Sequence, residues 1–260
     1  MENQIIVIKV GTGVVSRASG RLDDFYIGSL VDQICRLRKL GQKIVLVSSG
    51  AIGAGIEALG LSSRPKNLNK LQACAAIGQG RLMKLYEESF RKRGTHAAQI
   101  LLTQDDFNNS SRRINAKHTL LGLLNDYKAV PVINENDSIA LEEIKFGDND
   151  KLSALVAKLV GAHTLIILTD VDGLYRPHDK KVISLVEKID KKIEKLATPS
   201  KGKFGMGGMI GKIGAAKQVT GAGIRCIIAN GRKKDVLFHT QKNKDTGTTF
   251  LAIKKKRTKK

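Results

Sequence analysis

QIIVIKVGTG, residues 4–13, is the stretch that decides the fold. Its apolar run, residues 5–10, is broken only by Lys9 and predicts a buried β-strand, and the glycines of Gly11-Thr12-Gly13 predict a turn directly after it. Lys9 therefore lies near the carboxyl end of a buried strand. A lysine there can extend along apolar surface into solvent, or it can serve a binding site at the strand's end.

The next segments continue this pattern of strands and glycine turns. Residues 23–40 carry apolar side chains at helical spacing and precede Gly41, a residue typical of a helix C-cap. Residues 43–47 predict a second buried strand, and the small residues of 48–55 form a glycine-rich turn that opens another helix. Strand, helix, strand, glycine turn and helix in this order predict a parallel α/β domain.

The remaining chain keeps the alternation of helices and buried strands. No internal repeat, linker or low-complexity segment precedes the last residues. We expect one doubly wound α/β domain over residues 1–253 and a basic, disordered tail over residues 254–260. The further helices expected are 68–93, 109–127, 149–160 and one that ends near 222, and the further strands are 97–102, 129–133, 163–168, 224–229 and 248–253.

The chain carries a large positive charge, since 45 Lys and Arg against 24 Asp and Glu give a net charge of +21. This excess raises the question of a nucleic acid or an anionic membrane as partner. Six of the positive charges lie in the last seven residues, KKKRTKK, which offer no aromatic side chain for base stacking. A solvated tail and a polyanion-binding tail both fit this pattern, and we do not expect nucleic acid as the partner.

Residue usage argues against several classes of protein. The three cysteines form no C-x-x-C pair and the five histidines are scattered, which argues against a disulfide scaffold and a zinc site. No apolar run approaches the ~18 residues of a membrane span, and the N-terminus has no secretory apolar region. We expect a soluble protein of the reducing cytoplasm without a membrane partner.

Acidic side chains gather in NENDSIALEEIKFGDND, residues 134–150, which holds six of the chain's 24 Asp and Glu. The segment follows the predicted strand 129–133 and so emerges at a carboxyl strand end, the edge where ligands bind in open α/β sheets. Within it, Asp137, Asp148 and Asp150 have the amide and glycine neighbours typical of positioned residues. We expect the segment to form the acceptor side of an active site, to which the rest of the chain brings a phosphate donor.

The glycine-rich turns match neither common nucleotide fingerprint. The loop before Lys212 lacks one glycine and the Ser or Thr of a Walker A motif, and the turn at 11–13 lacks the third glycine of the dinucleotide motif. A glycine turn that opens a helix can still hold phosphate through free N–H groups, and Lys212 adds a point charge there. A merely flexible loop fits residues 205–211 equally well. Ser49 lacks the G-x-S-x-G context of a nucleophile, so it is a ligand contact or a cap.

Six motifs together resemble the amino acid kinase family, in its order and with its separations, from residue 4 to about 253. NEND with the later FGDND, and the G-M-G-G-M loop, resemble in particular the members that phosphorylate glutamate. The motifs are VIKVGTGVV (7–15), LVSSGAIGAG (46–55), VINENDSIA (132–140), FGDND (146–150), LTDVDGLY (168–175) and GMGGMIGK (205–212).

The resemblance implies a three-layer αβα sandwich around a mainly parallel sheet, with ATP and L-glutamate on either side of its carboxyl edge. Lys9 and Lys212 would stabilise the phosphoryl group in transfer, and Asp150 would organise both lysines. The other implied contacts are Ser49, Asp137 and Asn149 for glutamate, and Thr169, Asp170, Met206, Gly207, Gly208, Met209, Ile210, Gly211 and Lys212 for ATP.

The resemblance also implies a metal ion, an inhibitor and an assembly. Mg²⁺ would bridge the ATP phosphates, although no carboxylate can be named as its ligand from the sequence. Proline would act as a feedback inhibitor, and the chain would form a homo-oligomer. Many bacterial members continue into a small C-terminal domain where this sequence ends in KKKRTKK, and this departure puts the implied regulation in question.

The implied chemistry suits the residues present. A γ-carboxylate acceptor is already ionised at pH 7, so transfer needs alignment and charge neutralisation and no general base. Two lysines can supply the cations required between a carboxylate acceptor and a polyanionic donor. Kinases of aspartate, N-acetylglutamate, carbamate or UMP share the nucleotide half and stay as alternatives, as does a polyanion-binding protein that has kept a kinase fold.

Overall fold

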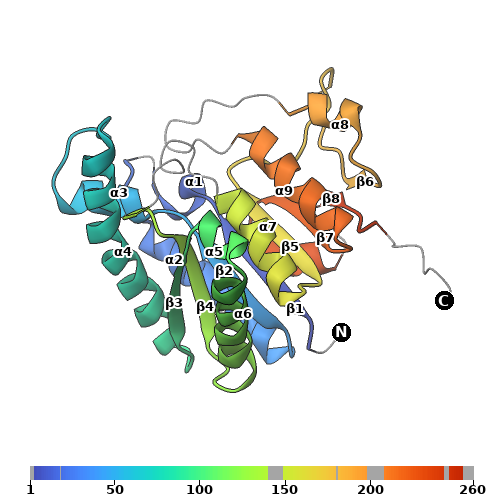
Figure 1. Cartoon of the computed structure of the whole chain (residues 1–260). Helices are drawn as coiled ribbons and strands as arrows, with labels where there is room; N and C mark the ends of the chain where they lie inside the picture. Colours follow the sequence, from blue (N-terminus) through green and yellow to red (C-terminus); the bar gives the residue numbers. More distant parts are fainter. Residues whose placement is uncertain are drawn as a thin grey trace.

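A single sheet runs through the centre of the molecule, with helices on both faces (Figure 1). The structure is a computed structural model that describes residues 3–17, 19–139, 149–179, 181–197, 208–242 and 246–253. Across the described part the strand order is β3-β4-β2-β1-β5-β7-β8-β6. The strands are β1 Ile5–Val10, β2 Lys43–Ser48, β3 Ala97–Leu102, β4 Val130–Glu135, β5 Thr164–Thr169, β6 Leu185–Val186, β7 Arg225–Asn230 and β8 Thr248–Phe250.

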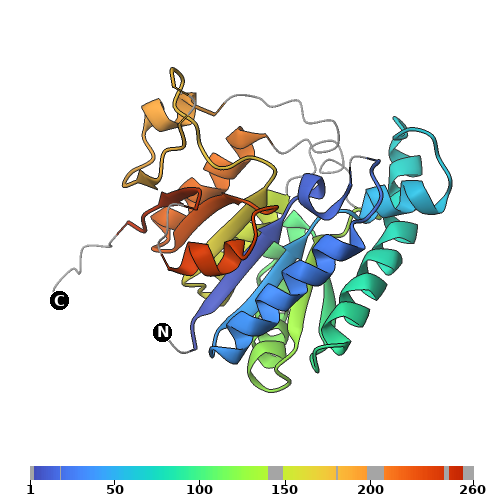
Figure 2. The same ribbon diagram turned by 180° about the vertical axis from the view of Figure 1, so that it is seen from behind.

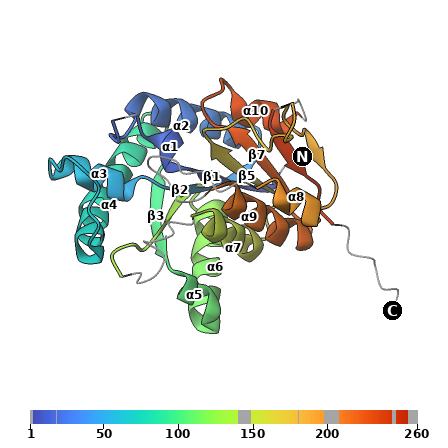
Figure 3. The ribbon, with the colours of Figure 1, turned by 90° about the horizontal axis from the view of Figure 1, so that it is seen from above.

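The helices form two layers around this sheet, as the view from above shows (Figure 3). α1, α2 and α10 cover one face, which is seen from behind in Figure 2, and α6, α7 and α9 cover the other. The helices are α1 Thr12–Val15, α2 Asp24–Lys39, α3 Ala51–Ala58, α4 Leu68–Arg91, α5 Gln104–Asn108, α6 Ser110–Asn125, α7 Asn149–Val160, α8 Lys191–Lys195, α9 Met209–Gly221 and α10 Val236–Gln241.

Strand β1 separates two hydrophobic cores because successive side chains of a strand point to opposite faces. Ile6 and Ile8 belong to the core that includes α2, whereas Val7 belongs to the core formed with α7 and α9. Lys9 lies two residues after Val7 and so shares its face. The strand therefore directs Lys9 under α7 and α9 and not toward solvent.

The sheet changes its direction of winding at β1, which pairs in parallel with β2 on one side and with β5 on the other. Helix α2 leads from β1 to β2 across one face, and α7 leads from β4 to β5 across the other. In open α/β sheets the crevice at such a switch point, outside the carboxyl strand ends, is where ligands bind. The ends of β1, β2, β4 and β5 all reach this edge.

Helices α3 and α4 approach each other closely enough for their backbones to touch. A Cβ atom added to Gly55 would lie 1.8 Å from the carbonyl oxygen of Cys74, and one added to Gly78 would lie 1.8 Å from that of Ala51. Only glycine fits at these two positions. The contact fixes the start of α3, and with it the turn that joins β2 to α3.

The predicted fold, an αβα sandwich with a mainly parallel sheet, is confirmed. The expected main helices and strands are present, with ends shifted by at most three residues, and α4 runs through Gly78 and Gly80 without interruption. The short elements α1, α5, α8, α10 and β6 were not predicted. Strand β8 runs antiparallel to β7, and the sequence carried no signal for that reversal. The expected tail, residues 254–260, lies outside the described residues.

None of the described helices combines the length and the apolar character that crossing a membrane requires.

Candidate active site

Two lysines and one aspartate meet beneath the carboxyl edge of the sheet. The Nζ atom of Lys9 lies 2.5 Å from Oδ1 of Asp150, and the Nζ atom of Lys212 lies 3.0 Å from Oδ2 of the same carboxylate. All three residues are buried, with 6%, 1% and 6% of the surface of Lys9, Asp150 and Lys212 exposed. Lys9 therefore does not extend into solvent, and that alternative is wrong.

Three different elements bring these side chains together. Lys9 comes from β1, Asp150 is the second residue of α7, and Lys212 is the fourth residue of α9. Both helices begin at the carboxyl edge of the sheet (Figure 1). Because α7 and α9 pack side by side over the face that carries Lys9, their first turns place one carboxylate between two ammonium groups.

The two lysines keep the carboxyl group of Asp150 in its ionised form. Burial raises the pKa of the Asp150 carboxyl, but the neighbouring Lys9 and Lys212 ammonium groups outweigh that effect and hold the pKa below its ordinary value of 3.8. Asp150 is therefore ionised at neutral pH. With both lysines protonated, the three side chains carry a net charge of +1, which suits an anionic group.

Asn149 ties the start of α7 to the turn after β2. Its Nδ2 atom donates to the Oγ atom of Ser49 at 2.9 Å and to the backbone oxygen of Ser48 at 3.2 Å. The turn continues through Gly50, whose φ of +113° lies in the left-handed region that favours glycine. Ser49 and Asn149, two residues predicted to hold the acceptor, are thus in direct contact.

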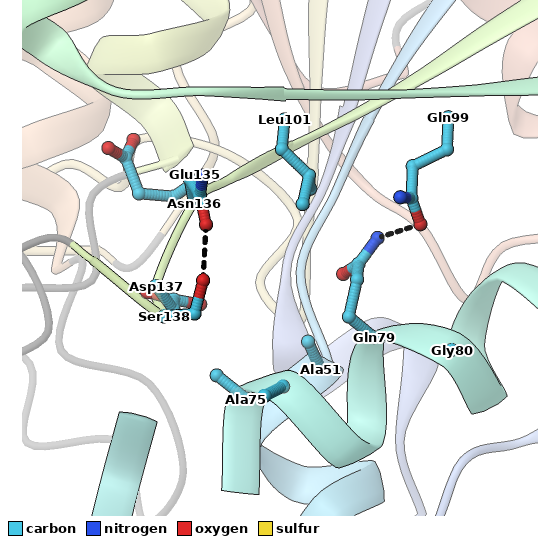
Figure 4. Close-up of a pocket in the computed structure, with 11 residues that line it drawn as sticks. Ala51, Ala75, Gln79, Gly80, Gln99, Leu101, Glu135, Asn136, Asp137 and Ser138 are labelled. Carbon is cyan, nitrogen blue, oxygen red and sulfur yellow. Dashed lines mark hydrogen bonds between the residues drawn. The ribbon is translucent and has the colours of Figure 1, made fainter. Parts of the chain in front are cut away.

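Asp137 lines a cavity beside this turn, between α4 and the ends of β3 and β4 (Figure 4). The cavity has a volume of about 370 Å³, and Glu135 and Asp137 are among the residues that line it. The carboxylate of Glu135 points away from Gln79 and Ala51 (Figure 4). Ala51, the first residue of α3, lines it too, so the cavity adjoins the Ser49 turn. The structure therefore places Asp137 apart from the Lys9 cluster but on the same edge of the sheet.

The cavity lies at the ends of β3 and β4, on one side of β1 in the sheet. The predicted nucleotide contacts Thr169 and Asp170 lie at the end of β5, on the opposite side of β1. Thr169 ends β5, and its Oγ1 atom donates to Oδ1 of Asp170 at 3.1 Å. Two residues further, Asp172 accepts a hydrogen bond from Nδ2 of Asn230 at 2.9 Å and pairs with Nζ of Lys233 at 3.1 Å. Asn230 and Lys233 were not predicted from the sequence, because neither lies in a recognisable motif.

The predicted phosphate loop is described only in part. Gly208 is the N-cap of α9 and has an extended backbone conformation, and residues 209–212 form the first turn of the helix. The N–H groups of such a turn can bind an anion. Met206 and Gly207 lie outside the described residues, as does Asp148 of the acidic segment.

No group of three or more His, Cys, Asp or Glu side chains able to hold a metal ion occurs among the described residues. Asp150 is engaged by two lysines, so it is poorly suited to join such a group. Mg²⁺ in nucleotide sites is commonly held mainly by the phosphates and by only one or two carboxylates.

The sequence matches the amino acid kinase family over residues 4–230. The chain belongs to the amino acid kinase family. Within this family, the glutamate 5-kinase of Caldanaerobacter subterraneus subsp. tengcongensis is 47% identical over 96% of this chain and 68% of its own length. The glutamate 5-kinase of Clostridium tetani is 46% identical over 96% of this chain and 95% of its own length.

A solved structure shares the amino acid kinase fold. Carbamate kinase from Giardia lamblia bound to AMP-PNP superposes with a TM-score of 0.64 and covers 96% of this chain and 99% of its own. Its sequence identity to this chain is 19%, so the likeness supports the fold alone.

Proposed function

We infer that this chain is an ATP-dependent kinase that phosphorylates the γ-carboxylate of L-glutamate to γ-glutamyl phosphate, the first step of proline biosynthesis. The observation that carries the inference is the Lys9–Asp150–Lys212 cluster, which lies at the same edge of the sheet as the cavity lined by Asp137. The relatives at 46–47% identity, both glutamate 5-kinases, support glutamate as the acceptor.

The charges of the two regions match the two ends of the acceptor. L-Glutamate carries an α-ammonium group, which suits the carboxylate of Asp137, a residue that lines the cavity. Its γ-carboxylate must approach the transferring phosphoryl group, and the net positive cluster around Asp150 offsets the repulsion between these two anions. The acceptor would lie between the cavity and the cluster, against Ser49 and Asn149.

Transfer in this site relies on alignment and charge. The γ-carboxylate is ionised, so no side chain has to remove a proton from it. An ammonium group has three N–H donors, so a lysine that donates one to Asp150 can also donate to phosphoryl oxygens. Asp150 then acts by holding both ammonium groups in position, while Thr169, Asp170 and the first turn of α9 face the nucleotide. Mg²⁺, bound to the phosphates, would supply further charge neutralisation.

A panel of acceptors tests the choice of substrate. The purified chain is incubated with ATP, Mg²⁺ and one of L-glutamate, L-aspartate, N-acetyl-L-glutamate, carbamate or UMP, and ADP release is measured. We expect rapid release with L-glutamate and at most background release with the others. Release with another acceptor and none with glutamate would assign the chain to a different activity within the family.

A further inference from the structure

Four side-chain amides form a continuous hydrogen-bonded chain from α7 to the edge strand β3. Asn149 Nδ2 donates to Asn134 Oδ1 at 2.9 Å, Asn134 Nδ2 donates to Gln79 Oε1 at 2.9 Å, and Gln79 Nε2 donates to Gln99 Oε1 at 3.1 Å. Figure 4 shows the last of these bonds, where Gln79 and Gln99 line the cavity. Asn134, Asn149 and Gln79 are buried, with 2%, 7% and 9% of their surfaces exposed.

Two backbone groups fix the direction of this amide chain. The oxygen and nitrogen of a side-chain amide have nearly the same shape, so their assignment must come from partners with a fixed role. The backbone N–H of Glu135 can only donate, and it lies 2.9 Å from Asn134 Oδ1. The backbone oxygen of Ser48 can only accept, and it lies 3.2 Å from Asn149 Nδ2. Both anchors give the same direction, from Asn149 through Asn134 to Gln79.

This direction determines which end of Asn149 is left for a ligand. The NH₂ group of Asn149 faces three acceptors, namely Ser48 O, Ser49 Oγ and Asn134 Oδ1. Its Oδ1 atom is buried and has no hydrogen-bond partner within the described part of the chain. A buried acceptor without a partner is costly, so a donor from a bound molecule would be favoured at this atom.

We propose that Asn149 recognises the acceptor substrate through Oδ1, as a hydrogen-bond acceptor, and that Asn134 and Gln79 are positioning residues that hold it in this orientation. The proposal rests on the assignment of Asn149 to the glutamate site. On L-glutamate at neutral pH only the α-ammonium group can donate, since both carboxylates only accept. Asn149 therefore binds the ammonium group, and the hydroxyl proton of Ser49, whose oxygen accepts from Asn149, is available to a substrate carboxylate.

The test compares L-glutamate with glutarate, which has both carboxylates and no amino group. In the full chain, Gln79→Met removes the acceptor for Asn134 while keeping side-chain length. We expect the KM for L-glutamate to rise about fivefold to tenfold, as the loss of one buried hydrogen bond implies. The Ki of glutarate as a competitive inhibitor and the KM for ATP should change less than twofold, because neither ligand donates to Asn149.

A second variant and a matched control complete the test. Asn134→Leu removes the acceptor for Asn149 itself and should raise the KM for L-glutamate tenfold or more, again without moving the Ki of glutarate. Gln33 on α2 is a buried glutamine away from the site, where its Oε1 accepts from the backbone N–H of Leu237 at 3.1 Å. Gln33→Met should leave all three constants within twofold, even if stability falls.

The possible outcomes separate this proposal from the proposed function. If the KM for L-glutamate and the Ki of glutarate rise together in the folded variants, Gln79 and Asn134 only shape the cavity, and the proposal is wrong. If neither constant moves, the orientation of Asn149 does not depend on the amide chain, and the proposal is equally wrong. A wild-type chain without turnover of L-glutamate would overturn the proposed function, and this inference with it.

Discussion

The carboxylate of Asp150 lies 3.0 Å from the ammonium group of Lys212, although the two residues are 62 positions apart in the sequence. The contact joins the first turns of α7 and α9, and both residues are buried. Removing two charges from water costs about as much free energy as their attraction returns, so a buried ion pair is not expected here for stability alone. The proposed function gives this pair another reason, which is the binding of phosphate.

Loss of either lysine should remove turnover and leave the fold intact. Lys9→Ala and Lys212→Ala each delete a cation that the proposed function places at the transferring phosphoryl group, and kcat should fall at least about 100-fold. Circular dichroism of the variants should match wild type. Lys217→Ala is the control, because Lys217 lies on α9 but pairs with Glu194 at an exposed position. Near-normal turnover in Lys212→Ala would refute the role given to this residue.

Asp150→Asn should change the dependence of stability on pH. The pKa of Asp150 is lowered below 3.8 in the folded chain, so its ion pairs stabilise the fold fully above that value and are lost as the pH falls through the lowered pKa. At pH 7 the variant leaves two buried cations without their anion, and it should unfold about 3–5 kcal/mol more easily. Urea unfolding should show this difference shrinking below about pH 4. A difference that does not change between pH 7 and pH 3 would contradict the account.

Asp137→Ala should act on the acceptor and not on the nucleotide. The side chain lines the cavity assigned to L-glutamate, so the KM for L-glutamate should rise about tenfold or more, as expected for a lost contact to a charged group. The KM for ATP should stay within about twofold. Asp126→Ala, at an exposed position at the end of α6, should change neither constant. A rise in the KM for ATP alone would mean that the two halves of the site are reversed.

Gly78→Ala should destabilise the chain, because the added Cβ would lie 1.8 Å from the backbone oxygen of Ala51 and α3 would have to move. Overpacking of this kind costs about 1–3 kcal/mol, and more where backbone must shift. Gly80→Ala in the same helix meets no atom within 4 Å and should stabilise by about 0.5–1 kcal/mol. Equal effects of the two substitutions in thermal unfolding would show that α3 and α4 do not need this close contact.

Strand and helix periodicity was enough to predict most of the sheet and the strand ends at which the candidate site lies. Lys9, Ser49 and Asn134 were placed correctly at the ends of buried strands, because apolar runs mark such strands clearly. That Lys9, Lys212 and the acidic segment share one site could be inferred from the residues, but the role of Asp150 between the two lysines came only from the family resemblance. Sequence spacing does not specify how two helices pack over a strand, and the three residues come from three separate elements.

The amide chain could not be predicted because its members belong to four different elements. Asn134 and Asn149 lie in quoted motifs, but Gln79 and Gln99 do not. Gln79 did leave one signal in the sequence. It shares the helical face of Ala75, Leu82 and Tyr86, all of which are buried, and a polar residue on such a face needs a polar partner. Its partner Asn134 is supplied by β4, and only the three-dimensional packing of α4 against the strand ends brings the two together.

The most direct test of the central claim is to trap the product of the wild-type chain. With ATP, Mg²⁺, L-glutamate and hydroxylamine, an acyl phosphate at the γ-carboxylate is converted to γ-glutamyl hydroxamate, which mass spectrometry identifies. We expect the hydroxamate to form in proportion to ADP and to be absent when ATP is omitted. ADP release from an active preparation without any γ-glutamyl hydroxamate would contradict the transfer of phosphate to glutamate.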